Sequence, residues 1–295
     1  MIELPSVATR VDAEGKFREE ITFFEVNGTR IFSVLYRPVA PATIGLVVCP
    51  PILMEHIKNY RYEVLLARAL AARGIAVHRF HYRGTGHSDG EESAGSDETM
   101  VEDTLAAVRR LREQMGVSQI ALHGTRWGAR VAALAAAESA LELPMSFWEP
   151  IVDGARYFRE LVRARLIRQV KDPRFADAAT DGWMEEMARD GRLDILGYPL
   201  YRKVYESGRG SRLDQLLGAR PCDVLLVQLT PSSTVRPDVA RLKQAVESAG
   251  GSCEVRIIKE EPGWMFVGHR LKSADKLISV TAEWIVNRAG RDARA

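Results

Sequence analysis

Residues 124–128 read Gly-Thr-Arg-Trp-Gly, which is the frame of a nucleophile elbow with Arg126 at its centre. In such an elbow, the flanking glycines allow a strained turn between a buried strand and a helix, so that the central side chain projects into a pocket. A guanidinium stays protonated and donates hydrogen bonds without accepting any. Arg126 therefore cannot attack a carbonyl carbon as a serine or cysteine would. The sequence predicts the frame of a serine hydrolase without its nucleophile.

The same turn predicts an anion site. We expect the backbone N–H of Trp127, at the start of the elbow helix, and an N–H from the loop 51–55 to converge as an oxyanion hole, assisted by the helix dipole. A guanidinium at that point matches the oxygens of a carboxylate or a phosphate. The alternative is that Arg126 fills the pocket and pairs with an internal carboxylate, Glu55 or Glu149, because an unpaired buried arginine is too costly.

Strand-like and helix-like stretches alternate along most of the chain, which predicts a mostly parallel sheet with helices on both faces. Asn27-Gly28 predicts a hairpin between residues 17–26 and 31–37. The other expected strands are 44–49, 75–80, 118–122, 145–148, 224–229 and 254–258. The expected helices are 60–73, one opened by a Thr99/Glu102 capping box, 129–139, and two that begin near Asp238 and Ala274.

Residues 151–219 break this alternation with a helical pattern and no clear strand. We expect them to form a helical cap over the carboxyl ends of the strands, inserted into a core of residues 1–150 and 220–295. One basic amphipathic helix in this insertion carries arginines 156, 159, 163, 165 and 168. A solvated polar face over an apolar one that covers the core is the favoured interpretation, and a membrane-surface helix or a dock for an acidic partner is the alternative.

Composition narrows the class of protein. The 295 residues are 46% hydrophobic and carry a net charge of +2, which gives no reason to expect a nucleic-acid partner. Three widely spaced cysteines make neither a disulfide framework nor a metal motif, and strand alternation separates His81 from His78, so we expect no metal or other cofactor. No apolar run approaches about 18 residues and no signal-peptide core is present, which predicts a cytoplasmic protein without an integral membrane segment.

Several motifs in order resemble the α/β-hydrolase superfamily over nearly the whole chain. They are the element order, the elbow frame and Tyr-Arg-Gly-Thr-Gly-His-Ser-Asp-Gly at 82–90. Within the superfamily, the chain resembles the hydrolase-like proteins associated with exosortase and exopolysaccharide gene systems. That resemblance rests on Pro50-Pro51 with Glu55 and Asn59, Gly124-x-Arg126-x-Gly128-Ala129, residues 148–154 and Gly-Tyr-Pro-Leu at 197–200.

The superfamily resemblance implies three catalytic positions, and the chain departs from the pattern at each. The nucleophile position is Arg126. The acid position falls in Thr-Pro-Ser-Ser-Thr at 230–234, which includes Ser233, and the base position falls in Pro-Gly-Trp-Met-Phe at 262–266, which includes Met265. A displaced pair of His269 and Asp238 is an alternative. Cys49 as a displaced thiol is a second alternative, against the simpler interpretation of a buried strand cysteine.

We therefore expect a pseudo-hydrolase whose pocket binds an anionic or acyl small molecule. The alternative is an enzyme of altered mechanism, such as a hydrolase, acyltransferase or lyase, in polysaccharide or secondary-metabolite biosynthesis. The sequence leaves open whether the chain forms a homodimer or binds a biosynthetic partner protein. The expected catalytic residues are Arg126 and His269, and the expected binding residues are Trp127, Pro51, Ile52, Glu55, Trp148, Tyr198, Ser233 and Met265.

Overall fold

The computed structural model describes residues 8–139, 143–171, 182–261 and 274–292. Within these ranges, nine strands form one sheet in the order β1-β2-β3-β5-β4-β6-β7-β10-β11. The strands are β1 (Ala8–Val11), β2 (Phe17–Val26), β3 (Thr29–Pro38), β4 (Ile44–Cys49), β5 (Ala76–Phe80), β6 (Gln119–Thr125), β7 (Met145–Trp148), β10 (Asp223–Leu229) and β11 (Ser252–Ile258).

The part of the sheet from β5 to β11 is parallel, whereas β1, β2 and β3 join it through antiparallel pairs. Helices α1 (Leu53–Ala71) and α9 (Ala274–Asp292) contact each other on one face of the sheet. Helices α2 (Asp97–Met115), α3 (Trp127–Ser139), α7 (Leu213–Leu217) and α8 (Pro237–Ser248) pack in sequence on the other face. The predicted fold class, an α/β-hydrolase fold with a mostly parallel sheet covered on both faces, is confirmed.

The hairpin at Asn27-Gly28 is also confirmed, since β2 pairs antiparallel with β3 around these two residues. Their φ angles are 49° and 77°, so both adopt the left-handed conformation that a tight hairpin turn of this kind requires. Strands β4 and β7 have the predicted bounds. Local turn chemistry and continuous apolar runs were therefore sufficient to predict these elements.

Two predicted helix starts are wrong. Helix α1 begins at Leu53 instead of residue 60, because its N-cap residue, Ile52, makes no side-chain capping bond that a sequence pattern could show. Helix α2 is opened by a capping box of Ser96 and Thr99, in which each residue bonds the backbone N–H of the other. The predicted box of Thr99 and Glu102 lies one turn too late. As a result, residues 53–55 belong to a helix and not to a loop.

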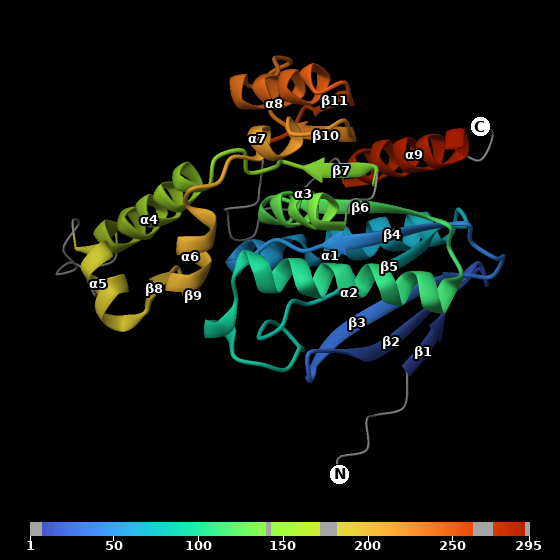
Figure 1. Cartoon of the computed structure of the whole chain (residues 1–295), viewed down its shortest axis with the longest axis horizontal. Coiled ribbons are helices and arrows are strands. Elements are labelled where there is room, and N and C mark those ends of the chain that lie inside the picture. Colours follow the sequence, from blue (N-terminus) through green and yellow to red (C-terminus); the bar gives the residue numbers. More distant parts are fainter. Residues whose placement is uncertain (1–7, 140–142, 172–181, 262–273, 293–295) are drawn as a thin grey trace, which may run out of the picture.

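The insertion between β7 and β10 extends to one side of the sheet (Figure 1). It contains α4 (Gly154–Lys171), α5 (Trp183–Asp190), α6 (Arg202–Gly208), α7 and an antiparallel hairpin of β8 (Arg192–Ile195) and β9 (Tyr198–Tyr201). The prediction of helices without strands was therefore wrong for the hairpin, whose strands of four residues are too short to show periodicity.

Among the described helices, none combines the length and apolar character needed to cross a bilayer.

Helix α4 has the predicted polarity. Its side chains Tyr157, Phe158 and Leu161 are buried, whereas Arg156 and Arg159 are exposed. The helix therefore covers part of the core and presents arginines to solvent, which is the favoured of the two interpretations of its sequence.

Buried histidines make the fold sensitive to acid. Burial lowers the pKa of His78 to about 4 and the pKa of His123 to about 3. The ring of His78 bonds the carbonyl oxygen of Ala107, and the ring of His123 bonds Ser146 Oγ. Both rings are neutral in the fold, so protonating them favours the unfolded chain.

We predict that the free energy of unfolding falls as the pH drops from 6.5 towards 4. The stabilising contribution of His78 is present above its ordinary pKa of 6.5 and is lost as the pH approaches its pKa of about 4. Glutamine does not titrate, so His78→Gln should lose about 3 kcal/mol less of its free energy of unfolding than the wild type between pH 6.5 and pH 4. Urea titrations at a series of pH values would measure how the free energy of unfolding of each protein changes with pH. The same change for both proteins would contradict the prediction.

Candidate functional site

Arg126 occupies the elbow between β6 and α3 with a φ angle of 54°. A Cβ on Gly124 would lie 2.4 Å from the backbone nitrogen of Ala129, and a Cβ on Gly128 would lie 2.0 Å from the carbonyl oxygen of Cys49. Both positions therefore accept only glycine. The strained residue and the two close approaches show that the sequence motif forms the sharp strand-to-helix turn expected of it.

The guanidinium of Arg126 is held by a carboxylate in the first turn of α1. Its Nε donates to Glu55 Oε1 at 3.0 Å, and its Nη1 donates to the carbonyl oxygen of Glu149 at 3.3 Å. The hydroxyl of Tyr157, from α4, donates to Glu55 Oε2 at 3.1 Å. The two oxygens of Glu55 are therefore shared between the elbow and the insertion.

The charges around this pair fix the protonation of Arg126. Burial lowers the pKa of Arg126 and is the largest single effect, but the charges of Glu55, Tyr157 and Glu149 and the hydrogen bond to Glu55 together outweigh it, so that the pKa is raised. Burial beside Glu55 raises the pKa of Tyr157 as well, so its hydroxyl stays protonated and can donate. The ring of Tyr157 lies 5.8 Å from the guanidinium carbon of Arg126. The site therefore holds a permanent cation at the elbow.

Glu149 follows β7 and adds a second strained residue, with a φ angle of 48°. Its Oε1 accepts from the backbone N–H of Leu229 at 2.6 Å, and its Oε2 accepts from Arg236 Nη1 at 2.8 Å. Both oxygens are thus used to join the ends of β7 and β10. The side chain of Glu149 is fixed by these contacts and does not pair with Arg126.

Arg126 lines a cleft of about 370 Å³ at the carboxyl ends of the strands. The other charged residues of the cleft are Glu149, Asp153, Arg156, Glu160, Arg236, Asp238 and Arg241. Each of the four acids already accepts from protein donors. Among the described residues that line the cleft, Nη2 of Arg126 and the side chain of Arg241 have no hydrogen-bond partner. The uncommitted groups are therefore donors, which suits an anion.

Three of the predicted binding residues lie at another cavity. Pro51, Ile52 and Tyr198 line a cavity of about 220 Å³, which has no lining residue in common with the cleft beside Arg126. Glu55 lines neither cavity because its side chain is fully buried beneath Arg126. The structure thus divides residues that the sequence had assigned to one pocket.

The two predicted tryptophans are buried in different halves of the core. Trp127 stacks on Tyr157 at 5.3 Å, and its Nε1 donates to Asp97 Oδ1. Trp148 donates from Nε1 to Thr281 Oγ1 at 2.8 Å, in the cluster that contains α9. The structure places neither side chain among the residues that line the two cavities.

The remaining sequence candidates lie apart. Ser233 is in the exposed segment after β10, and Met265 and His269 lie outside the described residues. Asp238 lines the cleft, where it accepts from Arg236. Cys49 is fully buried, and burial raises its pKa to about 12, so the thiol stays protonated and packs as a core residue.

A buried network ties the insertion to the elbow. Asp97 accepts hydrogen bonds from the indole of Trp127 and the guanidinium of Arg130, and its backbone N–H donates to Ser207 Oγ in α6. A Cβ on Gly208 would lie 2.4 Å from the ring of Trp127. Sequence reasoning missed this network because its members are far apart in the chain. It also missed the contacts of Arg236 with Glu149 and of Tyr157 with Glu55.

Comparisons with known proteins agree with the fold. A family model described as serine aminopeptidase, S33, matches residues 43–146. No curated protein sequence matches the chain. The chain is similar in structure to Est1E from Butyrivibrio proteoclasticus with bound ferulic acid, with a TM-score of 0.66, 16% identity, and coverage of 91% of this chain and 99% of that chain.

Two further solved structures have the same architecture. An esterase from Pyrococcus furiosus has a TM-score of 0.63 at 14% identity, with 98% of each chain covered. DcsB in complex with a substrate analogue has a TM-score of 0.62 at 16% identity, with coverage of 91% of this chain and 98% of that chain. At these identities the comparisons show the α/β-hydrolase fold.

We predict that breaking the Arg126–Glu55 pair from one side destabilises the fold. Glu55→Leu leaves a buried guanidinium without its carboxylate and should lower the free energy of unfolding by about 3–5 kcal/mol. The double variant Glu55→Leu with Arg126→Met replaces both charges by apolar groups and should recover most of that loss. Tyr157 loses its acceptor in both variants, so the difference between their free energies of unfolding reports the cost of the unpaired guanidinium. Urea unfolding measures these free energies. A double variant no more stable than the single variant would refute the account.

Proposed function

We propose that this protein binds a small anion in the cleft beside Arg126 and does not act as a serine hydrolase. The observation that carries the proposal is the position of Arg126: a permanent cation stands at the elbow, and its guanidinium lines an open cleft. A hydrolase elbow presents its central side chain to the bound ligand. Here that side chain supplies N–H donors instead of an attacking oxygen.

The balance of donors and acceptors in the cleft supports an anion. The acids of the cleft accept from protein donors, whereas Arg241 and one terminal nitrogen of Arg126 have no partner among the described residues. Arg126 also keeps its Nε on Glu55, so the cation stays in place whether or not a ligand is bound. A carboxylate or a phosphate group accepts from such planar donors in a bidentate manner.

The start of helix α3, directly after Arg126, adds a favourable electrostatic term, although Trp127 itself is buried and does not line the cleft. Trp127 is the first residue of α3, so its N–H has no partner within the helix and lies at the positive end of the helix dipole. The sequence resemblance supports a setting in polysaccharide or secondary-metabolite assembly.

The test is titration of the full chain with inorganic phosphate and with acetate by calorimetry. Arg126→Lys should weaken binding about tenfold because the planar fork is lost, and Arg126→Glu should abolish it. Arg241→Gln, at an exposed position on the cleft, should weaken it about threefold.

A matched control is Arg189→Gln. Arg189 is exposed on α5, pairs with Asp190 and does not line the cleft. Its replacement removes one positive charge from the surface and should leave binding unchanged. If wild type binds neither anion, or if all the variants bind like wild type, the cleft is not an anion site.

We further predict that the chain does not react covalently with fluorophosphonate probes and does not hydrolyse p-nitrophenyl acetate above background. Covalent labelling needs an activated oxygen, and Arg126 provides none. Arg126→Ser should stay nearly inactive because Ser233 and Met265 supply neither acid nor base. Intact-mass spectrometry after labelling measures the adduct, and stoichiometric modification of any serine would disprove the prediction.

A further inference from the structure

A second cavity lies between the core and the insertion. It has a volume of about 220 Å³ and is bounded by the N-terminal end of α1, the segment 82–86 after β5, and residues of β9 and α6. Its apolar walls come from Pro51, Ile52, Leu53, Ile57, Met100, Pro199, Leu200 and Val204. None of these residues lines the cleft beside Arg126, so the two spaces have separate walls.

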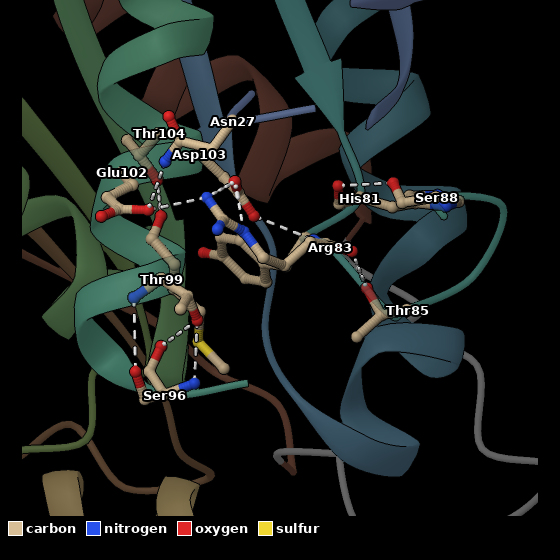
Figure 2. Close-up of polar contacts among 12 residues, drawn as sticks. Asn27, His81, Arg83, Thr85, Ser88, Ser96, Thr99, Glu102, Asp103 and Thr104 are labelled. Carbon is tan, nitrogen blue, oxygen red and sulfur yellow. Dashed lines mark hydrogen bonds and ion pairs between the residues drawn. The ribbon is translucent and has the colours of Figure 1, made fainter. Parts of the chain in front are cut away.

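The cavity offers no free positive charge among its described lining residues. Its one arginine, Arg83, is turned onto α2, as Figure 2 shows. Arg83 donates from Nε and Nη2 to Asp103 Oδ1 at 2.9 and 2.7 Å, and from Nη2 to Glu102 Oε2 at 2.9 Å. The acidic residue Glu92 also lines the cavity. An anion would find no available cation there, so the lining disfavours anionic ligands.

Neutral polar groups are available instead. Burial, with the charge of Arg79, lowers the pKa of His56 to about 4, so its ring is uncharged at neutral pH. The hydroxyls of Tyr198 and Tyr201 have no hydrogen-bond partner among the described residues. These groups can each give or take one hydrogen bond with a ligand that carries no charge.

We propose that this cavity binds an uncharged small molecule with a single aromatic ring and one hydroxyl group. An apolar cavity of about 150 Å³ holds one benzene ring, so about 220 Å³ accommodates a ring with a short polar substituent. The apolar walls take the ring, and His56, Tyr198 and Tyr201 are the candidates to bond the hydroxyl. Because the walls come from both the core and the insertion, the ligand also joins these two parts.

The experiment uses benzyl alcohol as the probe and benzoate as the charged analogue with the same ring. Benzyl alcohol should bind saturably in calorimetry, and benzoate should not displace it, even if benzoate binds at Arg126. Val204→Phe, which fills the cavity from α6, should reduce benzyl alcohol binding at least tenfold. Ile57→Glu, at an exposed site on the rim, should weaken it about threefold without affecting the core.

Arg126→Lys is the opposite control, since it should leave benzyl alcohol binding unchanged. A crystal soaked with 4-bromobenzyl alcohol should show anomalous density for bromine between α1 and β9. The proposal fails if benzyl alcohol does not saturate, if benzoate competes with it, if Val204→Phe and Ile57→Glu both bind like wild type, or if the bromine lies elsewhere.

Discussion

The buried ion pair between Arg126 and Glu55 joins three parts of the molecule that are far apart in sequence. Arg126 comes from the elbow, Glu55 from the first turn of α1, and Tyr157 of α4 donates to the second oxygen of Glu55. A buried guanidinium needs a carboxylate partner, so this elbow requires α1 to start early enough to supply one. The same carboxylate needs a further donor, which the insertion supplies. The bond from Tyr157 to Glu55 is therefore one of the contacts that hold the insertion at the elbow, beside the bond from Asp97 to Ser207.

This constraint also explains the division of space around the elbow. Glu55 and Tyr157 are buried at Arg126, with the polar cleft on the side of Glu149 and Arg236. The apolar cavity is lined by Ile52 and Leu53, three and two residues before Glu55 in the chain. A serine is small and uncharged, and would need no such partners. The arginine at the elbow therefore bears on both the chemistry of the central residue and the packing around it.

Much of the fold was predictable because local signals and tertiary structure agree. Asn27-Gly28 fixed a hairpin, and the apolar runs of β4 and β7 marked strands with the correct bounds. Where local signals were weak, prediction failed. Ile52 gives no capping signal for α1, and the strands β8 and β9 are only four residues long. The misplaced start of α1 had a direct consequence, because it placed Glu55 in a loop.

The site was predictable only in part for the same reason. Arg126 and two candidate partners, Glu55 and Glu149, could be named from the elbow frame and the cost of a buried charge, and the structure pairs Arg126 with Glu55. Nothing in the local sequence indicated that Tyr157 would donate to Glu55, or that Arg236 would hold Glu149, since those contacts depend on how the insertion and β10 pack. The separation of the two cavities is likewise a property of the packed structure.

The most direct test of the central claim is a crystal structure of the full chain soaked in phosphate. The account predicts phosphate oxygens within about 3 Å of the Arg126 guanidinium, with its Nε still bonded to Glu55. A cleft without phosphate density at a concentration that occupies other surface sites would contradict it. So would a guanidinium turned away from the cleft, because Arg126 would then only fill space at the elbow.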